Sequence, residues 1–234
     1  MRYRRVCIKL SGEVFGGKKG TGFDHAVIDS LAMQVRSVYE LGAEIGLVVG
    51  GGNIFRGSRS APVGMDRVAG DHMGMLATVI NGIFLQDSLE RHGLETRLMT
   101  AIEMRSIAEP YIKRRMERHV EKRRIVIFAA GTGNPYFTTD TAAALRASEM
   151  GADLLVKATK VDGVYDKDPL KYPDAQRFDT LSYQEVLRRD LSVMDATAIA
   201  FCKENRIPIL VLNIEETDVL ARAVRGESIG TVVS

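Results

Sequence analysis

The stretch VVGGGNIFRG, residues 48–57, ends an apolar run with three glycines and places an arginine shortly after them. The run that leads into it, IGLVV at 45–49, does not alternate between polar and apolar residues. A continuous apolar run of this length is typical of a strand buried on both faces of a parallel sheet. Glycines directly after such a strand let the backbone approach a ligand closely. This stretch therefore predicts an α/β fold with a binding site at the carboxyl edge of its sheet.

Apolar runs of similar length recur along the chain, separated by segments with helical periodicity. The predicted strands are 6–10, 45–49, 96–100, 125–130, 153–158 and 207–212. The first predicted helix begins near Asp24, a candidate N-cap, and the later helices are 71–91, 110–122, 139–149, 182–189, 194–205 and 217–224. Strands that alternate with helices are typical of α/β proteins. We therefore expect one domain over 1–234, a three-layer sandwich with a largely parallel central sheet and helices on both faces.

The overall charge gives no sign of a nucleic-acid or membrane partner. Lys and Arg total 32 against 30 Asp and Glu, for a formal net charge of +2. The basic run at 113–124 is interrupted by Glu117 and Glu121 at helical spacing, as on a solvated helix face. The apolar part of the N-terminus is too short for a signal sequence, and no apolar run approaches the ~20 residues that span a bilayer. We expect a cytoplasmic protein.

The cysteines and histidines form no pattern of a disulfide or metal site. Cys7 lies in a predicted strand and Cys202 in a predicted helix, without CxxC spacing, so both are expected to be buried thiols. The four histidines are scattered along the chain, whereas zinc ligands usually recur at short spacings. We expect no zinc site.

Glycine and polar residues follow the predicted strands rather than precede them. They form KLSG at 9–12, GGGN at 50–53, GTGN at 131–134 and KATKVDG at 157–163. Ligands of open parallel sheets bind at the carboxyl ends of the strands. Exposed amide groups in such loops form an anion-binding concavity, and an arginine such as Arg56 can fork onto phosphate oxygens. A tight turn explains one glycine loop, but four loops at one edge predict a phosphate site.

Two lysines at this predicted edge need an explanation. Lys9 lies within a strand-like run and Lys157 follows the apolar DLLV. A lysine is costly to bury without a partner, so each either extends to solvent or faces an anion. Asp140 at a predicted helix start is either an ordinary N-terminal carboxylate or the group that orients these lysines. Thr138 and Thr139, at the same helix N-terminus, are well placed to bind phosphate.

Two common nucleotide motifs do not fit the chain. The segment GEVFGGKK at 12–19 has the spacing of a P-loop, but Lys19 stands where Ser or Thr should hold magnesium. The segment GTGNPY at 131–136 begins like a dinucleotide fingerprint, but Tyr136 occupies the last glycine position. Both of the usual phosphate-binding folds are therefore unfavourable interpretations.

Taken together, these segments resemble the amino acid kinase family, and within it the branch of bacterial uridylate (UMP) kinases. The matching segments follow one another through nearly the whole chain: KLSGE at 9–13, GGGNIFRG at 50–57, GDHMGMLAT at 70–78, AGTGNPYFTTD at 130–140, KATKVDGVYDKDP at 157–169 and VMDATA at 193–198. The resemblance implies the amino acid kinase fold and transfer of a phosphoryl group from ATP to UMP. It implies Mg²⁺ bound through the phosphates of ATP, without a metal ligand from the protein. It also implies an N-terminal UMP-binding lobe of about 1–150 and a C-terminal ATP-binding lobe of about 151–234.

The resemblance also assigns residues to each part of the site. The catalytic residues it implies are Lys9, Lys157, Asp140 and Arg56. The ATP contacts it implies are Lys9, Leu10, Ser11, Gly12, Gly52, Arg56, Thr159, Tyr165 and Asp168. The UMP contacts it implies are Gly51, Asp71, Thr132, Gly133, Asn134, Pro135, Tyr136, Phe137, Thr138 and Thr139. In this interpretation the two lysines neutralise the transferring phosphoryl group and Asp140 holds their geometry.

Some of these assignments leave alternatives. Asp71 is expected to bind ribose, while Thr132 and Asn134 could read the edge of uracil. Tyr165 could stack on adenine or be a packing residue. Asp168 could contact ribose, base or metal, and we favour ribose or base because magnesium often binds through phosphates and its own waters.

The resemblance further implies a homohexamer that GTP activates and UTP inhibits. The segment that aligns with the GTP-binding region, GKKGTG at 17–22, keeps its glycines but carries Lys18 and Lys19 and has Thr21 where an apolar residue is expected. The predicted helix 71–91 is more apolar than a solvent-exposed helix should be, so it is either a subunit interface or an ordinary core helix.

Two other functions remain open at this point. A relative that phosphorylates a carboxylate or carbamate would share KLSG, GGGN and the later Lys and Asp signals, although GDHMGM and TGNPYFTTD argue against it. A nucleotide sensor without catalysis would have no need for Lys9, Lys157 and Asp140, which are all present.

Overall fold

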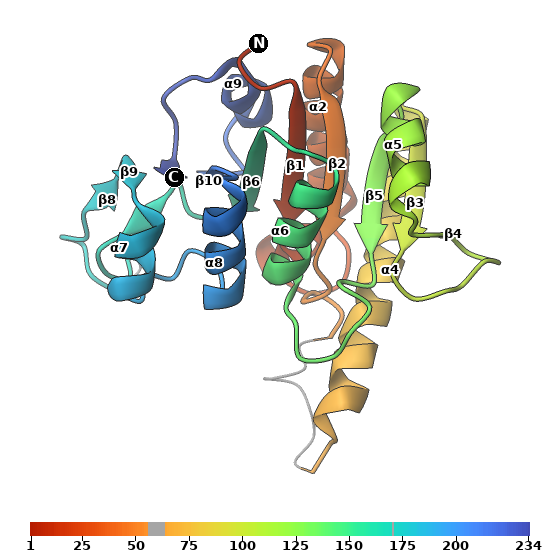
Figure 1. Ribbon diagram of the computed structural model, residues 1–234, viewed down its shortest axis with the longest axis horizontal. Coiled ribbons are helices and arrows are strands. Elements are labelled where there is room, and N and C mark those ends of the chain that lie inside the picture. Colours follow the sequence, from red (N-terminus) through yellow and green to blue (C-terminus); the bar gives the residue numbers. More distant parts are fainter. Residues whose placement is uncertain (56–63, 170) are drawn as a thin grey trace.

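The computed structural model describes residues 1–55, 64–169 and 171–234 (Figure 1). Its central sheet has nine strands among these residues, in the order β4-β3-β5-β2-β1-β6-β10-β11-β9. The strands are β1 (Arg5–Leu10), β2 (Glu44–Val49), β3 (Thr96–Thr100), β4 (Glu109–Pro110), β5 (Ile125–Ala129), β6 (Leu154–Thr159), β9 (Thr180–Leu181), β10 (Ile209–Asn213) and β11 (Thr231–Val233). All neighbours pair in parallel except β10 and β11. A separate antiparallel pair is formed by β7 (Val164–Tyr165) and β8 (Arg177–Phe178).

The helices fill the connections between the strands. They are α1 (Gly12–Phe15), α2 (His25–Glu40), α4 (Arg67–Arg91), α5 (Lys113–Glu121), α6 (Thr139–Glu149), α7 (Tyr183–Arg188), α8 (Ala196–Asn205) and α9 (Val219–Arg225), with a 3-10 turn η1 (Gly17–Lys19). Asp24 caps α2 as predicted, since its carboxylate accepts the backbone N–H of Val27.

All six predicted strands are present, with ends that differ by two residues at most. The short strands β4, β7, β8, β9 and β11 were not predicted, because two or three residues are too few to show a periodicity. The predicted helix at 110–122 is shorter than expected and spans Lys113–Glu121, because Pro110 pairs with the edge of the sheet in β4. The predicted three-layer α/β sandwich with a largely parallel sheet is confirmed.

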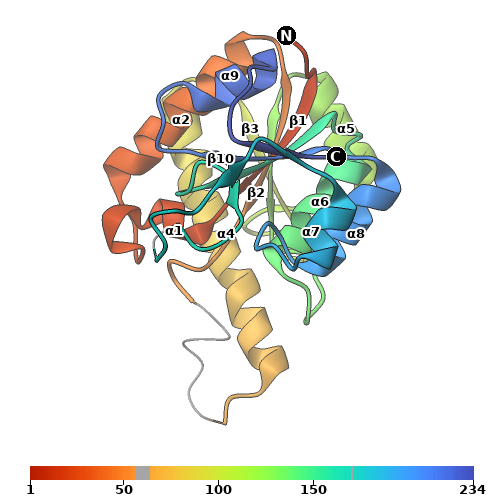
Figure 2. The same cartoon turned by 90° about the vertical axis from the view of Figure 1, so that its left-hand side faces the viewer.

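Each face of the sheet is covered by its own set of helices, as the edge-on view in Figure 2 shows. One core packs α2, α4 and α9 against one face, and the other packs α5, α6, α7 and α8 against the opposite face. Successive side chains of β1 point to opposite faces of the sheet, so Val6, Ile8 and Leu10 enter the first core and Cys7 enters the second. The strand is buried on both faces, which is why its sequence is continuously apolar.

Helix α4 extends well past the carboxyl edge of the sheet (Figures 1 and 2). By length and composition α4 is long and apolar enough to span a membrane, although we predicted no apolar run of that length. It is the one helix of the described residues that meets these criteria. In its most apolar 18-residue window, 44% is buried inside the protein. The inner face of α4 belongs to the first core, as expected of a core helix that meets the same length and composition criteria.

The two thiols are buried and free, as predicted. Burial raises the pKa of Cys202 to about 12 and raises that of Cys7 as well. Neither thiol is therefore a nucleophile at neutral pH.

Candidate active site

The register between β1 and β6 brings the two predicted lysines together. These strands are neighbours in the sheet although they are far apart in the sequence, and Lys9 pairs directly with Lys157. Both residues lie near the carboxyl ends of their strands. Side chains at directly paired positions point to the same face of a sheet. The sheet therefore presents two ammonium groups side by side.

Asp140, near the start of α6, lies between these lysines. Its Oδ1 is 2.8 Å from Nζ of Lys9, and its Oδ2 is 3.2 Å from Nζ of Lys157. The side chains of the three residues are only 11–19% exposed. Lys157 also donates to the carbonyl oxygen of Val193. The lysines therefore turn toward an anion rather than extending to solvent, and Asp140 orients both of them.

The charges in this triad determine its protonation. Burial acts to raise the pKa of Asp140, but the ammonium groups of Lys9 and Lys157 outweigh it and hold the pKa below its usual value. Burial lowers the pKa of Lys157, and Asp140 offsets this only in part. At neutral pH the carboxylate is ionised. The two cations leave a net positive charge for an anionic substrate.

We expect kcat to fall on the alkaline side at a pH below 10.5, the ordinary pKa of lysine, because Lys157 loses its proton early. Deprotonation of Lys157 does not itself unfold the protein, so unfolding through this lysine does not explain the loss of kcat. The unfolded chain binds that proton more tightly, so this lysine makes folding more favourable as pH rises toward 10.5. The measurement is kcat against pH, with circular dichroism at each pH to establish that the protein is folded. An alkaline limb at pH 10.5 or above would contradict the expectation.

The N-terminus of α6 presents backbone amides at the same edge. Thr138 caps this helix, and its hydroxyl oxygen accepts the N–H groups of Asp140 at 3.0 Å and Thr141 at 3.4 Å. The hydroxyl groups of both threonines donate to the carboxylate of Asp195, which itself caps α8. We did not predict Asp195 as a site residue. Its signal in the sequence was its place in VMDATA, where it reads as an N-cap.

The loops after β1 and β2 pack directly against each other. The N–H of Gly50 donates to the carbonyl of Leu10 at 2.8 Å. A Cβ added to Gly12 would overlap the amide nitrogen of Gly52, so glycine is required there. Ser11 precedes α1 as its N-cap. The side chain of Leu10 is fully buried, so only its backbone is available to a ligand.

A cavity of about 220 Å³ lies between the loop after β2, α4, the loop after β5 and the start of α6. Six of the predicted site residues line it, together with the neighbouring Gly131 in the loop after β5: Gly51, Gly52, Asp71, Phe137, Thr138 and Thr139. Asp71 accepts the backbone N–H of Tyr136 at 2.8 Å and lies 3.7 Å from Arg67. Tyr136, whose N–H donates to Asp71, has a left-handed backbone conformation with φ of 73°. The structure thus places the predicted nucleotide loop over α4.

The remaining predicted contacts lie around this cavity or in the segment after β6. Thr132 and Asn134 bond to each other, with the Asn134 N–H 3.2 Å from the threonine hydroxyl, and share their loop with Gly133 and Pro135. Thr159 ends β6. The Tyr165 hydroxyl donates to Asp162 at 2.7 Å, and Asp168 lies 3.4 Å from Lys171. Arg56 is outside the described residues.

The arrangement offers phosphate contacts but no protein cage for a metal. No group of three His, Cys, Asp or Glu residues with the spacing of a metal site occurs within 1–55, 64–169 and 171–234. The carboxylate of Asp140 is already engaged by two cations. Magnesium usually keeps several waters and binds through substrate phosphates. The residues present therefore fit a magnesium ion that arrives with a nucleotide.

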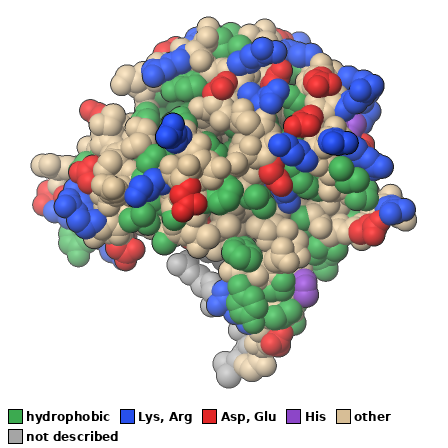
Figure 3. Space-filling view, viewed as in Figure 1, with side chains coloured by type: hydrophobic (Ala, Val, Ile, Leu, Met, Phe, Trp, Pro, Cys, Tyr) green, Lys and Arg blue, Asp and Glu red, His purple; other side chains and the backbone are tan. Residues whose placement is uncertain are grey.

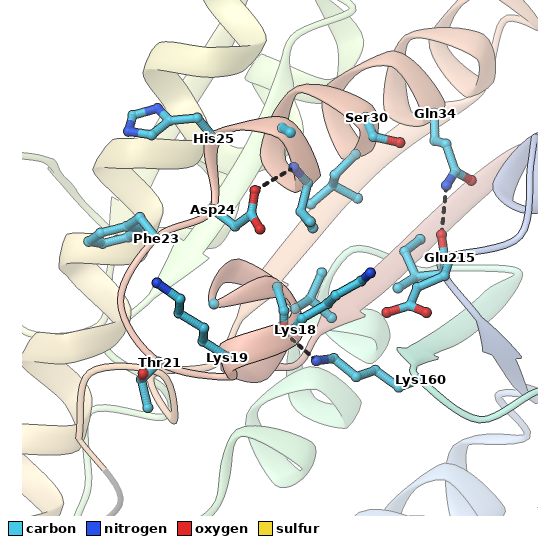
Figure 4. Close-up of a pocket in the computed structure, with 17 residues that line it drawn as sticks. Lys18, Lys19, Thr21, Phe23, Asp24, His25, Ser30, Gln34, Lys160 and Glu215 are labelled. Carbon is cyan, nitrogen blue, oxygen red and sulfur yellow. Dashed lines mark hydrogen bonds between the residues drawn. The ribbon is translucent and has the colours of Figure 1, made fainter.

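A larger cavity of about 660 Å³ lies elsewhere, between η1, the start of α2 and the end of β10 (Figure 4). Lys18 and Lys19 line it, and so does Lys160, whose ammonium donates to the carbonyl of Gly17 at 2.6 Å. Among the described residues, none of the predicted ATP or UMP contacts lines this cavity. It is therefore distinct from the site around Asp140.

Paired ammonium groups held by one carboxylate, beside amide-rich loops, suit the transfer of a phosphoryl group between two anions. The fold and site thus define a phosphotransferase built without a P-loop. The chain belongs to the amino acid kinase family, whose model matches residues 4–213.

Solved structures of several kinases share this fold over nearly their whole length. The UMP kinase from Bacillus anthracis has 38% sequence identity and a TM-score of 0.96, over 100% of this chain and 97% of that one. The UMP kinase from Ureaplasma parvum has 37% identity and a TM-score of 0.93, over 100% of both chains. The uridylate kinase from Archaeoglobus fulgidus has 28% identity and a TM-score of 0.74, over 98% of this chain and 99% of that one.

Proposed function

We propose that this protein transfers the terminal phosphoryl group of ATP to UMP and forms ADP and UDP, a step of pyrimidine nucleotide synthesis. The observation that carries the proposal is the triad of Lys9, Asp140 and Lys157 beside a cavity with amide-rich walls. Full-length similarity to UMP kinases at 37–38% identity supports UMP as the acceptor.

The chemistry needs little from the protein beyond placement and charge. The acceptor is a phosphate oxygen that is already anionic, so no general base is required. Lys9 and Lys157 would neutralise charge on the transferring phosphoryl group, and Asp140, which contacts both ammonium groups, would keep them in position. Mg²⁺ that enters with ATP would neutralise further phosphate charge. Arg56 completes the proposed catalytic set.

We place the two nucleotides on the two halves of the sheet. Strands β1 to β5 lie together on one side of the order and β6, β9, β10 and β11 on the other, which supports a division near residue 150. UMP would occupy the cavity beside Asp71 and the loop 131–139, and ATP would lie over the ends of β1 and β6 and the segment that contains Tyr165 and Asp168. The lysine pair sits at the boundary between the halves.

An assay of ADP release tests this function. UMP, CMP, dUMP and AMP are compared as acceptors, with acetylglutamate and carbamate as representatives of the other acceptor class. We expect turnover with UMP that exceeds turnover with every other compound. Phosphorylation of acetylglutamate or carbamate without phosphorylation of UMP would overturn the proposal. Addition of EDTA should abolish turnover.

We propose that the protein associates with copies of itself through α4. Met73, Leu76, Ile80 and Ile83 form a stripe at helical spacing on the outer face of this helix, each 42–50% exposed. Apolar side chains are visible on the protruding part of α4 in Figure 3. A stripe of this kind on a helix that already packs its other face fits a self-complementary contact between two copies. Three such dimers would give the homohexamer that the family resemblance implies.

Ile80→Asp is expected to lower the molecular mass in solution by breaking this contact, because a carboxylate at an apolar interface is desolvated without a partner. Analytical ultracentrifugation of the wild type and the variant measures the change. Met33→Asp is the matched control, since Met33 is 50% exposed on α2 and is not part of the α4 stripe. An unchanged mass for Ile80→Asp would remove α4 from the interface.

We also propose that the cavity in Figure 4 takes the effector nucleotide, GTP as activator or UTP as inhibitor. Lys18, Lys19 and Lys160 give this cavity three ammonium groups for a triphosphate. The UMP assay is repeated with GTP or UTP, and with Lys18→Met. Loss of an effector response in that variant, with unchanged basal turnover, would support this location.

A further inference from the structure

We infer that Asn81 is a positioning residue that, together with Asn53, fixes the glycine loop 50–53 in its working shape. The inference rests on the proposed function, because that loop would contact both nucleotides. Asn81 lies in the middle of α4 and is fully buried, and Asn53 ends the loop and is 4% exposed. A buried primary amide in an apolar helix is costly unless its polar atoms are all satisfied.

The two amides satisfy each other and two backbone carbonyls. Asn81 Nδ2 donates to the carbonyl of Gly50 at 2.6 Å and to Oδ1 of Asn53 at 2.7 Å. Asn53 Nδ2 donates to the carbonyl of Gly22 at 2.8 Å and to Oδ1 of Asn81 at 3.1 Å. All four N–H donors of the pair therefore have acceptors. Because a carbonyl accepts only, each amide must turn its nitrogen toward the loop it holds.

The Asn53–Asn81 pair holds a glycine loop, 50–53, that is already packed closely against α4. A Cβ on Gly51 would come within 2.8 Å of the Gly74 carbonyl and of Ala77, so the loop rests directly on the backbone of α4. On the next turn of the helix, the Thr78 hydroxyl accepts the N–H of Ala130, at the start of the second glycine loop. One face of α4 thus supports both loops, and Asn81 supplies the contact that orients the Gly50 peptide.

The orientation of that peptide matters to the proposed reaction. Gly50 also donates its N–H to Leu10, so its position links the loops after β1 and β2. Amides of these loops would face phosphate oxygens whose charge changes during transfer. Misplacement of such a group by about 1 Å costs about 10²-fold in rate. Loss of the amide pair should therefore lower kcat more than it weakens substrate binding.

Asn81→Asp tests this role with almost no change in volume. A carboxylate would place an acceptor against the Gly50 carbonyl, so we expect kcat to fall by about tenfold to 10²-fold, with smaller changes in KM. Asn53→Asp keeps an acceptor for the Asn81 amide, so the hydrogen bond from Asn81 to Gly50 is preserved. Its loss of kcat should therefore be smaller than that of Asn81→Asp. Ser88→Ala is the matched control, because Ser88 is also buried on α4 but donates to Asp29, away from the site.

The outcomes separate this role from a general loss of stability. The melting temperature of each variant is measured, and kcat is expressed per folded molecule. Equal kcat values for Asn81→Asp and Ser88→Ala would overturn the inference even if both are destabilised. Failure of the wild type to phosphorylate UMP would instead refute the proposed function. In that case, calorimetry with MgATP still tests the loop, since weaker binding by Asn81→Asp than by Ser88→Ala would support the inference and equal binding would reject it.

Discussion

Replacing Lys157 or Lys9 with Met is expected to lower kcat by about 10²- to 10³-fold, the effect of removing one preorganised donor from a transition state. Methionine replaces the apolar stem of lysine and lacks only the terminal ammonium, so the packing between the sheet and α6 should survive. What disappears is a positive charge that Asp140 holds within 2.8 Å or 3.2 Å at the carboxyl edge of the sheet. This charge has its largest effect when the phosphoryl group is between donor and acceptor.

The experiment compares kcat and KM of Lys9→Met and Lys157→Met with those of Lys113→Met. Lys113 is 57% exposed on α5, where its pair with Glu117 is a surface contact, so its replacement should leave kcat unchanged. Near wild-type turnover in both site variants would rule out the proposed neutralising role. A rise in KM alone, without a loss in kcat, would show that these lysines only bind substrate.

Asp140→Asn is expected to lower both kcat and the free energy of unfolding. The amide has nearly the same shape as the carboxylate, but it leaves two ammonium groups beside each other in a site where the side chains are only 11% and 19% exposed. Removing one partner from a buried ion pair typically costs about 3–5 kcal/mol. Urea unfolding measures this cost, and the phosphoryl-transfer assay measures the loss of kcat from misplaced lysines.

Asp87→Asn is the matched control for this variant. Asp87 is 65% exposed and pairs with Arg91 one turn away on α4, so its loss should cost less than about 1 kcal/mol. MgATP should restore part of the stability of Asp140→Asn if the lysines face phosphates, since a ligand that binds only the folded state stabilises it. The absence of any stability difference between the two variants would show that the triad is not an electrostatic unit.

The sequence could predict the fold class because strands that are buried on both faces of the sheet have continuously apolar sequences. IGLVV and the other continuous apolar runs became strands with ends shifted by two residues at most. The same reasoning predicted a site at one edge of the sheet, because glycine and polar residues follow those strands there. The family resemblance then assigned residues that the structure places around the cavity near Asp71 and the triad at Asp140.

Other site features left a weaker signal. Asp195 reads as the N-cap of α8, yet the structure shows it also binding two threonines at the start of α6. Asn81 appears as one amide in an apolar helix, and nothing in the sequence names Asn53 or Gly50 as its partners. The second role of α4, as a support for both loops, likewise depends on contacts between segments that are distant along the chain.

By itself the chain determined the six longer strands, the helices from α2 onward and the residue types at the strand ends, because these follow from local periodicity and composition. Only the tertiary structure decided that β6 lies beside β1, so that Lys157 pairs with Lys9 and Asp140 reaches both. The physical reason is that strand order is set by how all the helices pack on the two faces at once. No local pattern carries that information.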